Sequence, residues 1–463
     1  MKAIADPANA LARGLKDIRS QFKVPAQFPP QVIAAAEKAA KRAPTVHVDR
    51  TAVPFVTLDP SSSTDLDQAF FIEASGSDLL LRYAIADVAW FVADGDAVDQ
   101  EAWKRGTTFY LPDGKASLYP EVICQGAASL LPKGPRPAVI FAVRVAPDGT
   151  VKLDGVERAV IHSKAKLAYD SVKLSDLPPG FDELAKRIFA AEDKRGASRV
   201  DPPEQEVEAV GKGRYVLAFR PKLFSEEQNS AMSLAANMAV ADALAAHHTG
   251  LFRVMDDADA KEIASLRNAA KGLGLDWPKT IDLKDFQRTL DPSDPKQASL
   301  MLAIRRASPG ASYMAYKEGV KLWHAAVAAT YAHATAPLRR LADRYVVMAA
   351  LAVANSQAVP DWITAAFGKL PKVMARADGH ANQINRAVID LAEAVMLGGR
   401  EGEVFPAVVT DFTQNGVRVQ LCDLPVLANM AAQGVKPGDR LEARLTFVDP
   451  ETRILRFEPA GEG

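Results

Sequence analysis

Cysteine is scarce in this sequence, and long apolar runs are missing from it. The 463 residues include two cysteines, Cys124 and Cys422, which are far apart in the chain and offer neither a disulfide framework nor a CxxC metal site. No apolar run approaches the roughly 18–20 residues of a membrane span, and charged side chains interrupt the apolar stretches of residues 1–20. These absences exclude a disulfide scaffold and argue against secretion and membrane insertion. We therefore expect a protein of the reducing cytoplasm that has no membrane partner.

An excess of one charge is also missing. The 56 basic and 57 acidic residues leave a formal net charge of -1, but nucleic-acid binding responds to local fields rather than to the total. Residues 1–50 carry nine Lys or Arg against four Asp or Glu, a surplus of five, whereas residues 401–463 carry six basic and ten acidic residues. Each imbalance can mark a binding face or simply a solvated surface.

The basic N-terminal stretch shows two helical patterns. Apolar residues recur at helical spacing over residues 8–21, and a second such pattern covers residues 30–42. We interpret residues 1–45 as a basic helical region, which could be a helix-turn-helix-like RNA-binding module or a packed N-terminal arm.

The rest of the chain is expected to form two further domains. Short β-type runs fill residues 46–158, and long helical patterns follow at 225–244, 295–306, 338–355 and 376–396, an order typical of an α+β fold. We therefore expect a large catalytic domain with a mixed sheet over residues 46–400. Residues 401–463 contain only short strands and small turns, and this pattern resembles an OB-fold β-barrel that binds RNA.

An acidic cluster is the most chemically suggestive feature. Asp59, Asp65 and Asp67 fall within nine residues of a Pro- and Ser-rich loop that has no basic residue between them. Three carboxylates brought together repel one another, and a hard divalent cation such as Mg²⁺ offsets that repulsion. The alternative is an ordinary turn, because Asp, Ser and Pro also satisfy local loop geometry. The spacing alone does not decide between the two.

Several further motifs occur in a fixed order around this cluster, and together they resemble the ribonuclease II family with its RNB-type catalytic domain. The segments are YAIADVAWFV (83–92), DQEAWKRGTTFYLPD (99–113), LYPE (118–121), SLLP (129–132), SKAKLAYD (163–170), AMSLAAN (231–237) and YAHATAPLRRLAD (331–343). The resemblance covers roughly residues 46–400, and the expected C-terminal barrel fits the RNA-binding tail of that family. It implies a metal-dependent exoribonuclease.

The resemblance also implies roles for single residues, carried over position by position. The residues expected at the metal are Asp59, Asp65, Asp67 and Gln68; those expected in catalysis are Asp67, Arg339 and Tyr110; and those expected to bind RNA are Tyr110, Tyr169, Arg339 and Arg340. These roles are physically reasonable, because an arginine fork opposite a metal stabilises charge on phosphate oxygens and tyrosines stack on bases of any sequence. Arg344 could hold a neighbouring phosphate, but a charged helix face is the simpler interpretation for it.

The sequence also departs from the family pattern. Gln68 replaces the fourth aspartate and brings a carbonyl oxygen without a charge, which should lower divalent-metal affinity. Ala231 stands near the position of an expected glutamate, and a late helical glutamate within 386–393 cannot be assigned. Only about 45 residues precede the catalytic domain, so the paired cold-shock barrels of many members are not expected here. We expect the basic helices to replace them or RNA to enter differently.

The sequence therefore favours one function and leaves two alternatives open. The favoured function is 3′-to-5′ hydrolysis of single-stranded RNA, or of RNA 3′ overhangs, to nucleoside 5′-monophosphates with Mg²⁺, or with Mn²⁺ as the alternative ion. No obligate protein partner is inferred. The second reading is an RNA-binding protein of the same fold with weakened or lost hydrolysis, motivated by Gln68. The third is a metal-dependent phosphatase for small substrates, which the tyrosine and arginine motifs disfavour.

Overall fold

The central element of the computed structural model is a seven-stranded mixed sheet. The structure describes residues 2–4, 9–197, 204–210, 214–220, 223–291, 294–308 and 310–461. In sheet order the strands are β10 (Ala165–Ala168), β3 (Val56–Asp59), β4 (Gln68–Ser75), β5 (Asp78–Ala86), β8 (Arg136–Val145), β9 (Val151–Ile161) and β2 (Val48–Asp49). The β10–β3 and β9–β2 pairs are parallel and the pairs between them are antiparallel.

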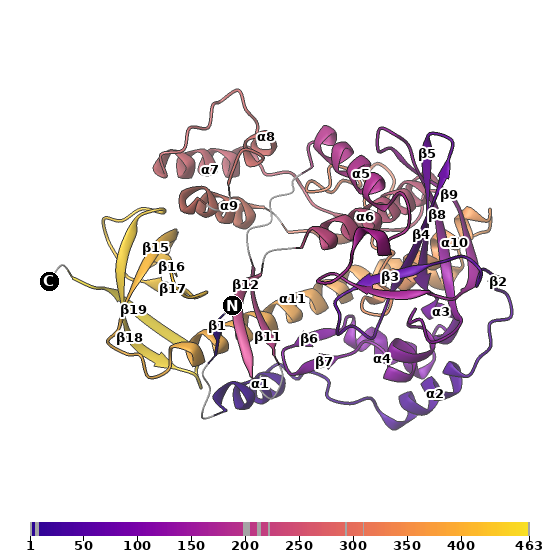
Figure 1. The fold of residues 1–463 in the computed structure, drawn as a ribbon, viewed down its shortest axis with the longest axis horizontal. Helices are drawn as coiled ribbons and strands as arrows, with labels where there is room; N and C mark the ends of the chain where they lie inside the picture. Colours follow the sequence, from indigo (N-terminus) through magenta and orange to yellow (C-terminus); the bar gives the residue numbers. More distant parts are fainter. Residues whose placement is uncertain are drawn as a thin grey trace.

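Helices cover this sheet and complete the main hydrophobic core (Figure 1). Helix α6 (Phe224–Ala246) packs against strands β5, β8 and β9, and α10 (Leu341–Ala354) packs against α6 and β9. Helix α5 (Phe181–Arg195) lies against α6, and the 37-residue helix α11 (Asp361–Leu397) runs from α10 to the C-terminal barrel. Sheet and helices segregate along the chain, so the α+β prediction is confirmed.

The remaining elements are short. They are β1 (Lys2–Ala3), α3 (Val88–Phe91), α4 (Ala97–Arg105), the π-helix Val122–Ala127, the 3₁₀ turn Leu174–Asp176, β11 (Glu204–Ala209), β12 (Tyr215–Arg220), β13 (Leu251–Val254), α7 (Ala260–Gly272), α8 (Leu283–Gln287), α9 (Pro295–Ala307) and β14 (Ser312–Ala315). Among the helices of the described residues, none combines the length and the apolar character needed to cross a membrane.

The two N-terminal helices do not form a helix-turn-helix unit. Helix α1 (Ala10–Gln21) buries Leu11, Leu15 and Ile18 in a cluster shared with α11. Helix α2 (Pro30–Ala40) instead packs on α4 and the π-helix as part of the main core. Because each amphipathic face packs in a different place, these helices pack as the arm alternative expects, and RNA binding by this region stays a prediction.

Helix α1 also fixes a hairpin made of β6 (Phe109–Leu111) and β7 (Gly114–Ala116). The Arg19 guanidinium donates to both carboxylate oxygens of Asp113, at 3.0 and 2.7 Å, and to the backbone oxygen of Gly114 at 2.9 Å. A bidentate pair with a third hydrogen bond sets the orientation of both partners. Part of the positive charge predicted to guide RNA is therefore used within the molecule.

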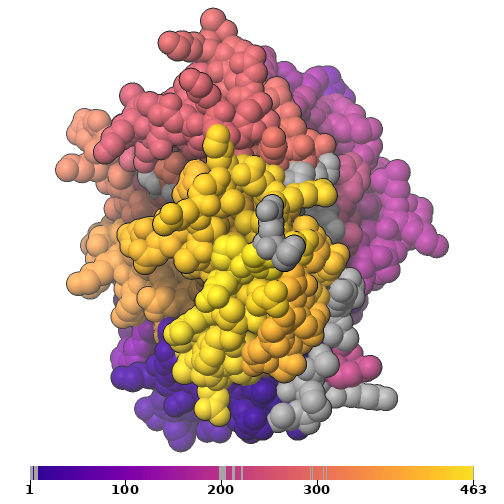
Figure 2. Space-filling view, turned by 90° about the vertical axis from the view of Figure 1, so that its left-hand side faces the viewer, coloured from indigo at the N-terminus to yellow at the C-terminus, as the bar shows by residue number. Residues whose placement is uncertain are grey.

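The C-terminal region is a closed five-stranded barrel, as the OB-fold prediction required. Its strands, in order, are β15 (Val404–Thr413), β16 (Gly416–Leu421), β17 (Leu427–Met430), β19 (Ile454–Pro459) and β18 (Arg440–Asp449). The barrel has its own hydrophobic core, to which Ala394 and Leu397 at the end of α11 contribute. Figure 2 shows the barrel with the α7–α9 segment on one side and N-terminal residues on the other.

Glu393, the one glutamate within residues 386–393, lies at the junction of α11 with the barrel. It is 4% exposed, and its Oε1 accepts hydrogen bonds from Gln205 Nε2 at 2.5 Å and from the Leu427 backbone N–H at 2.8 Å. Burial raises the pKa of this carboxyl from its usual 4.5 to about 7, although both hydrogen bonds act in the opposite direction.

This burial predicts a pH-dependent stability that Glu393→Gln should remove. The folded state binds the proton more tightly than the unfolded state does, so the contribution of Glu393 is most favourable below pH 4.5 and is lost as pH rises through about 7. Between pH 4.5 and 8, wild type should lose on the order of 2–3 kcal/mol of unfolding free energy relative to the variant. Urea unfolding of both proteins across this range measures the difference. A difference that does not change with pH would contradict the prediction.

Candidate active site

The acidic loop connects the end of β3 to the start of β4, so its carboxylates lie at one edge of the sheet. Asp59 is the last residue of β3 and Gln68 the first of β4. Between them, Leu66 is fully buried and its N–H donates to the Ser129 hydroxyl at 2.9 Å, which in turn donates to the backbone oxygen of Thr64 at 2.8 Å. These bonds anchor the loop from the SLLP segment and give that motif a structural role.

Asp67 is the most buried of the three aspartates. It is 6% exposed, its Oδ1 accepts from the Leu338 backbone N–H at 2.7 Å, and its Oδ2 lies 3.6 Å from Arg339 Nε. Burial raises the pKa of Asp67 to about 8, and the positive charge of Arg339 opposes this rise. The ionised form of Asp67 is therefore disfavoured by burial, and a nearby cation would stabilise it.

Asp59 shares this environment. Its Oδ2 is buried and has no hydrogen-bond partner among the described residues. Burial raises the pKa of Asp59 to about 7, with Arg339 and Lys166 acting in the opposite direction and Asp65 in the same direction. The free carboxylate oxygen of Asp59 is a candidate metal ligand.

Asp65 has a cation of its own. Its Oδ1 lies 2.6 Å from Lys115 Nζ, and the Tyr110 hydroxyl is 3.5 Å from its Oδ2. Tyr110 and Lys115 are directly opposite one another in the β6–β7 hairpin. Tyr110 as a whole residue remains 56% exposed, which leaves room for stacking on a base.

Gln68 belongs to a small hydrogen-bonded cluster. Its Oε1 lies within hydrogen-bond distance of the buried Tyr83 hydroxyl and of the Ser233 hydroxyl, the latter at 3.2 Å. These two hydroxyls also contact each other at 2.6 Å, so their two protons serve three contacts and one lone pair of Oε1 receives no proton from them. Metal binding by this oxygen stays a prediction.

Helix α6 supplies polar groups that the sequence analysis missed. Ser225, Asn229, Ser233 and Asn237 recur every fourth residue, so they lie along one face of the helix. Asn229 Nδ2 donates to the Tyr169 hydroxyl at 2.9 Å and to the Leu58 backbone oxygen at 3.2 Å. Polar residues at a spacing of four within an otherwise apolar helix were the signal that could have revealed them.

Arg339 is the exposed cation of the site. Its backbone oxygen accepts from the Thr107 hydroxyl at 2.8 Å and from the Thr108 N–H at 3.0 Å, so the RGTT segment fixes the turn that carries it. Burial raises the pKa values of Asp59, Asp67, Tyr110 and Tyr169, and the charge of Arg339 opposes this rise at all four groups. The structure thus brings these predicted residues together.

The two arginines that follow have other partners. Arg340 is half-buried and donates to both oxygens of Asp343, at 2.9 and 2.7 Å, while Asp343 also accepts from the Ala336 N–H. Arg344 is 2% exposed and pairs with Asp99 in the core. The expectation that Arg344 lies on a charged helix face is wrong, and its role as a phosphate ligand is excluded by burial. Binding of RNA by Arg340 stays a prediction.

Asp59 and Asp67 fit a metal ion that is held by only a few protein ligands. Within the described residues, no group of three or more His, Cys, Asp or Glu side chains is arranged to bind a metal ion. A pair of aspartates, Asp59 and Asp67, is the remaining candidate. Asp59 Oδ2 is buried without a hydrogen-bond partner, and burial raises the pKa values of both carboxyls. Mg²⁺ is commonly held by one or two carboxylates together with waters and substrate phosphates, so these two aspartates fit it.

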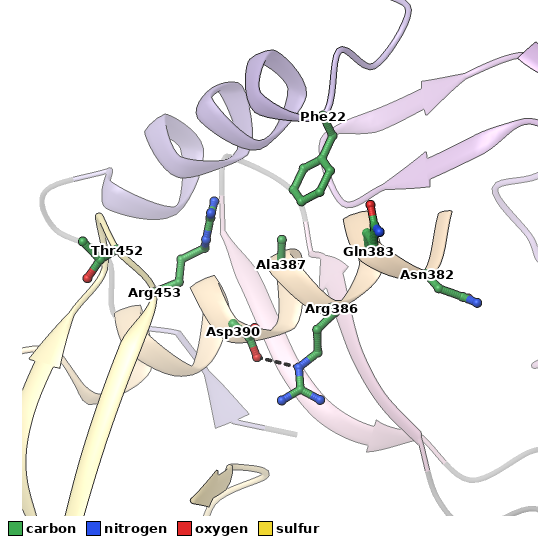
Figure 3. A pocket seen from close by; sticks show the side chains of 8 residues that line it. All are labelled: Phe22, Asn382, Gln383, Arg386, Ala387, Asp390, Thr452 and Arg453. Atoms are coloured by element: carbon green, nitrogen blue, oxygen red, sulfur yellow. Dashed lines mark hydrogen bonds and ion pairs between the residues drawn. The ribbon is translucent and has the colours of Figure 1, made fainter. Parts of the chain in front are cut away.

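A separate surface cavity of about 510 Å³ lies where α1, α11 and the β18–β19 turn meet (Figure 3). It is lined by Phe22, Arg386, Asp390 and Arg453 among others, and Arg386 donates to Asp390 at 2.9 Å. None of the residues predicted for the metal, for catalysis or for RNA binding lines this cavity.

Comparison with known proteins finds two family models that match this chain. The family model of the RNB domain matches residues 47–354, and that of the RNase II-type exonuclease C-terminal S1 domain matches residues 403–460. Ribonuclease R of Thermotoga maritima is 27% identical over 439 residues, covering 87% of this chain and 61% of the relative. The chain spans between 41% and 64% of the length of this and two further curated relatives, both also named Ribonuclease R.

Solved structures show the same fold at low sequence identity. The apo form of Mycoplasma genitalium RNase R superimposes with a TM-score of 0.86 at 20% identity, covering 99% of this chain and 79% of the other. Yeast Ssd1, described as a pseudonuclease, superimposes with a TM-score of 0.69 at 18% identity, covering 98% and 58%. One fold thus accommodates proteins described as nuclease and as pseudonuclease.

Proposed function

This chain belongs to the RNB-domain family, and from that premise we propose that it is a 3′-to-5′ exoribonuclease that hydrolyses single-stranded RNA, or RNA 3′ overhangs, to nucleoside 5′-monophosphates. The observation that carries the proposal is the placement of the exposed Arg339 3.6 Å from the buried Asp67, with its charge also acting on Asp59, whose Oδ2 is buried. An anion-binding guanidinium next to a carboxylate pair suits a phosphodiester and a divalent cation.

Each residue has a definable task in this reaction. Arg339 binds the scissile phosphate and stabilises the charge that develops on its non-bridging oxygens. Tyr110 and Tyr169 hold the terminal nucleotides by stacking, which is independent of sequence. Mg²⁺, or Mn²⁺ in its place, would be held by Asp59 and Asp67 and would supply Lewis-acid polarisation and an activated water.

Known relatives support RNA as the substrate. The curated relatives are named Ribonuclease R and Exoribonuclease 2, and Mycoplasma genitalium RNase R has been solved in complex with single-stranded and with double-stranded RNA. We extend this substrate class to the present chain, together with a cytoplasmic location and no obligate protein partner.

A second function is favoured by one specific observation. Gln68 stands at the position of the family's fourth aspartate, carries no charge, and its oxygen lies beside the Tyr83 and Ser233 hydroxyls. An RNA-binding protein with weakened or lost hydrolysis would be consistent with this replacement.

An RNA of about 30 nucleotides labelled at its 5′ end, incubated with the protein and Mg²⁺, tests the proposal. We expect a ladder of labelled products that shorten from the 3′ end, and no products in the presence of EDTA. An intact but retarded RNA band would favour the binding protein. An unchanged free RNA would overturn both functions.

A further inference from the structure

A lysine from the β6–β7 hairpin pairs with one of the aspartates of the acidic loop. Lys115 Nζ lies 2.6 Å from Asp65 Oδ1, and both side chains are largely shielded, with 21% and 10% of their surfaces exposed. An ion pair at this distance with restricted solvent contact is screened less than a surface pair. Asp65 is thus already neutralised by a group of the protein.

The position of Lys115 is fixed by its surroundings. It lies in the two-stranded β6–β7 hairpin, whose turn is held by the three hydrogen bonds from Arg19 of α1. Residues Phe109, Leu111 and Ala116 of the same hairpin are buried against α1 and α11. The ammonium group is therefore held beside Asp65 by the fold and does not depend on a mobile side chain reaching in from the surface.

Gln68, like Lys115, makes the charge of the acidic loop less negative. An amide in place of a carboxylate removes one negative charge, and the Tyr83 and Ser233 hydroxyls hold its oxygen. Compared with a loop of four carboxylates and no lysine, Gln68 and Lys115 together add two positive charges. This sum equals the charge of one divalent cation.

We propose that Lys115 is a built-in counter-ion for Asp65, so that this centre binds one divalent cation, at Asp59 and Asp67, and leaves Asp65 and Gln68 outside its coordination. The inference rests on the proposed function and specifies the metal requirement of the same site. Lys115 acts through Asp65 and is a positioning residue.

Manganese binding to the full chain, measured without RNA by isothermal titration calorimetry and by the electron paramagnetic resonance of free Mn²⁺, tests this assignment. Wild type should bind one ion. Lys115→Met should bind one ion about tenfold more tightly, because a positive charge close to the metal has been removed. The double variant Lys115→Met/Gln68→Asp should bind two ions. Lys115→Arg, which keeps the charge, should behave like wild type.

Lys104→Met is the matched control, because this lysine pairs with Glu101 on the surface with 72% of its side chain exposed. It should leave the titration unchanged. The proposal would be overturned if wild type bound two ions, or if Lys115→Met bound Mn²⁺ with the affinity of wild type. It would also be overturned if Lys104→Met raised the affinity for Mn²⁺ as much as Lys115→Met does. Circular dichroism of each variant confirms folding, and the wild-type stoichiometry alone remains decisive if one variant fails to fold. Because neither RNA nor turnover enters the titration, this inference and the exoribonuclease assignment fail separately.

Discussion

Asp67→Asn is expected to reduce RNA hydrolysis by at least about 10³-fold while RNA affinity stays within a few-fold of wild type. The substitution keeps the size and shape of the side chain, and the amide oxygen can still accept the 2.7 Å hydrogen bond from the Leu338 N–H. It removes the negative charge that faces Arg339 and one of the two carboxylates available to a cation. The stacking tyrosines and the exposed guanidinium remain in place.

Single-turnover cleavage of end-labelled RNA and a filter-binding titration in Ca²⁺ separate the two effects. Asp87→Asn is the matched control, because Asp87 is also buried, at 1% exposure, but its side chain pairs with His47 and Arg158, neither of which is a predicted site residue. That variant should lose stability and retain its cleavage rate per folded molecule. Parallel loss of binding and cleavage in Asp67→Asn would remove Asp67 from the chemical step.

Much of the fold could be predicted because its signals are local. The helical pattern at 295–306 matches α9, and that at 225–244 matches α6 within two residues at each end, since apolar spacing is a property of neighbouring residues. The pattern at 376–396 identified only the second half of α11. The helix begins at Asp361 and continues through Pro371, a residue that a sequence pattern treats as a break.

The sequence predicted which residues form the site, but it could not predict which other residues those side chains contact. The motifs named Asp59, Asp67 and Arg339, which the structure brings together. The partners of Gln68 could not be inferred, because Ser233 is 165 positions away and reaches it only through the packing of α6 on the sheet. Lys115 belongs to no motif that names a function, and only the docking of the hairpin places it at Asp65.

The arginines show how residues close in sequence can have opposite environments. Arg339 is exposed and Arg344 is buried, although they are five positions apart and carry the same charge. Arg344 lies in the second turn of α10, on the face that packs into the core, whereas Arg339 precedes the helix. The burial of a charged residue depends on whether a partner lies opposite it, here Asp99, and sequence patterns do not reveal that partner.

Arg344→Met is expected to lower the free energy of unfolding by about 3–5 kcal/mol, because it leaves the Asp99 carboxylate buried without its cation. Asp99 is 3% exposed, and its Oδ1 also accepts from the Tyr345 hydroxyl at 3.1 Å. Neutralising both partners, in Arg344→Met/Asp99→Asn, should recover a large part of this loss, since the unpaired charge is what makes the single variant unstable.

Urea unfolding of the single and double variants measures these differences, with Arg386→Met as the control for a surface pair. Arg386 pairs with Asp390 at 2.9 Å with 62% of its side chain exposed, so its loss should cost less than about 1 kcal/mol. RNA affinity per folded molecule should be unchanged in Arg344→Met, because a buried guanidinium cannot contact a phosphate. A loss below about 1 kcal/mol in that variant would mean that water reaches the pair, and a selective loss of RNA affinity would restore Arg344 as a phosphate ligand.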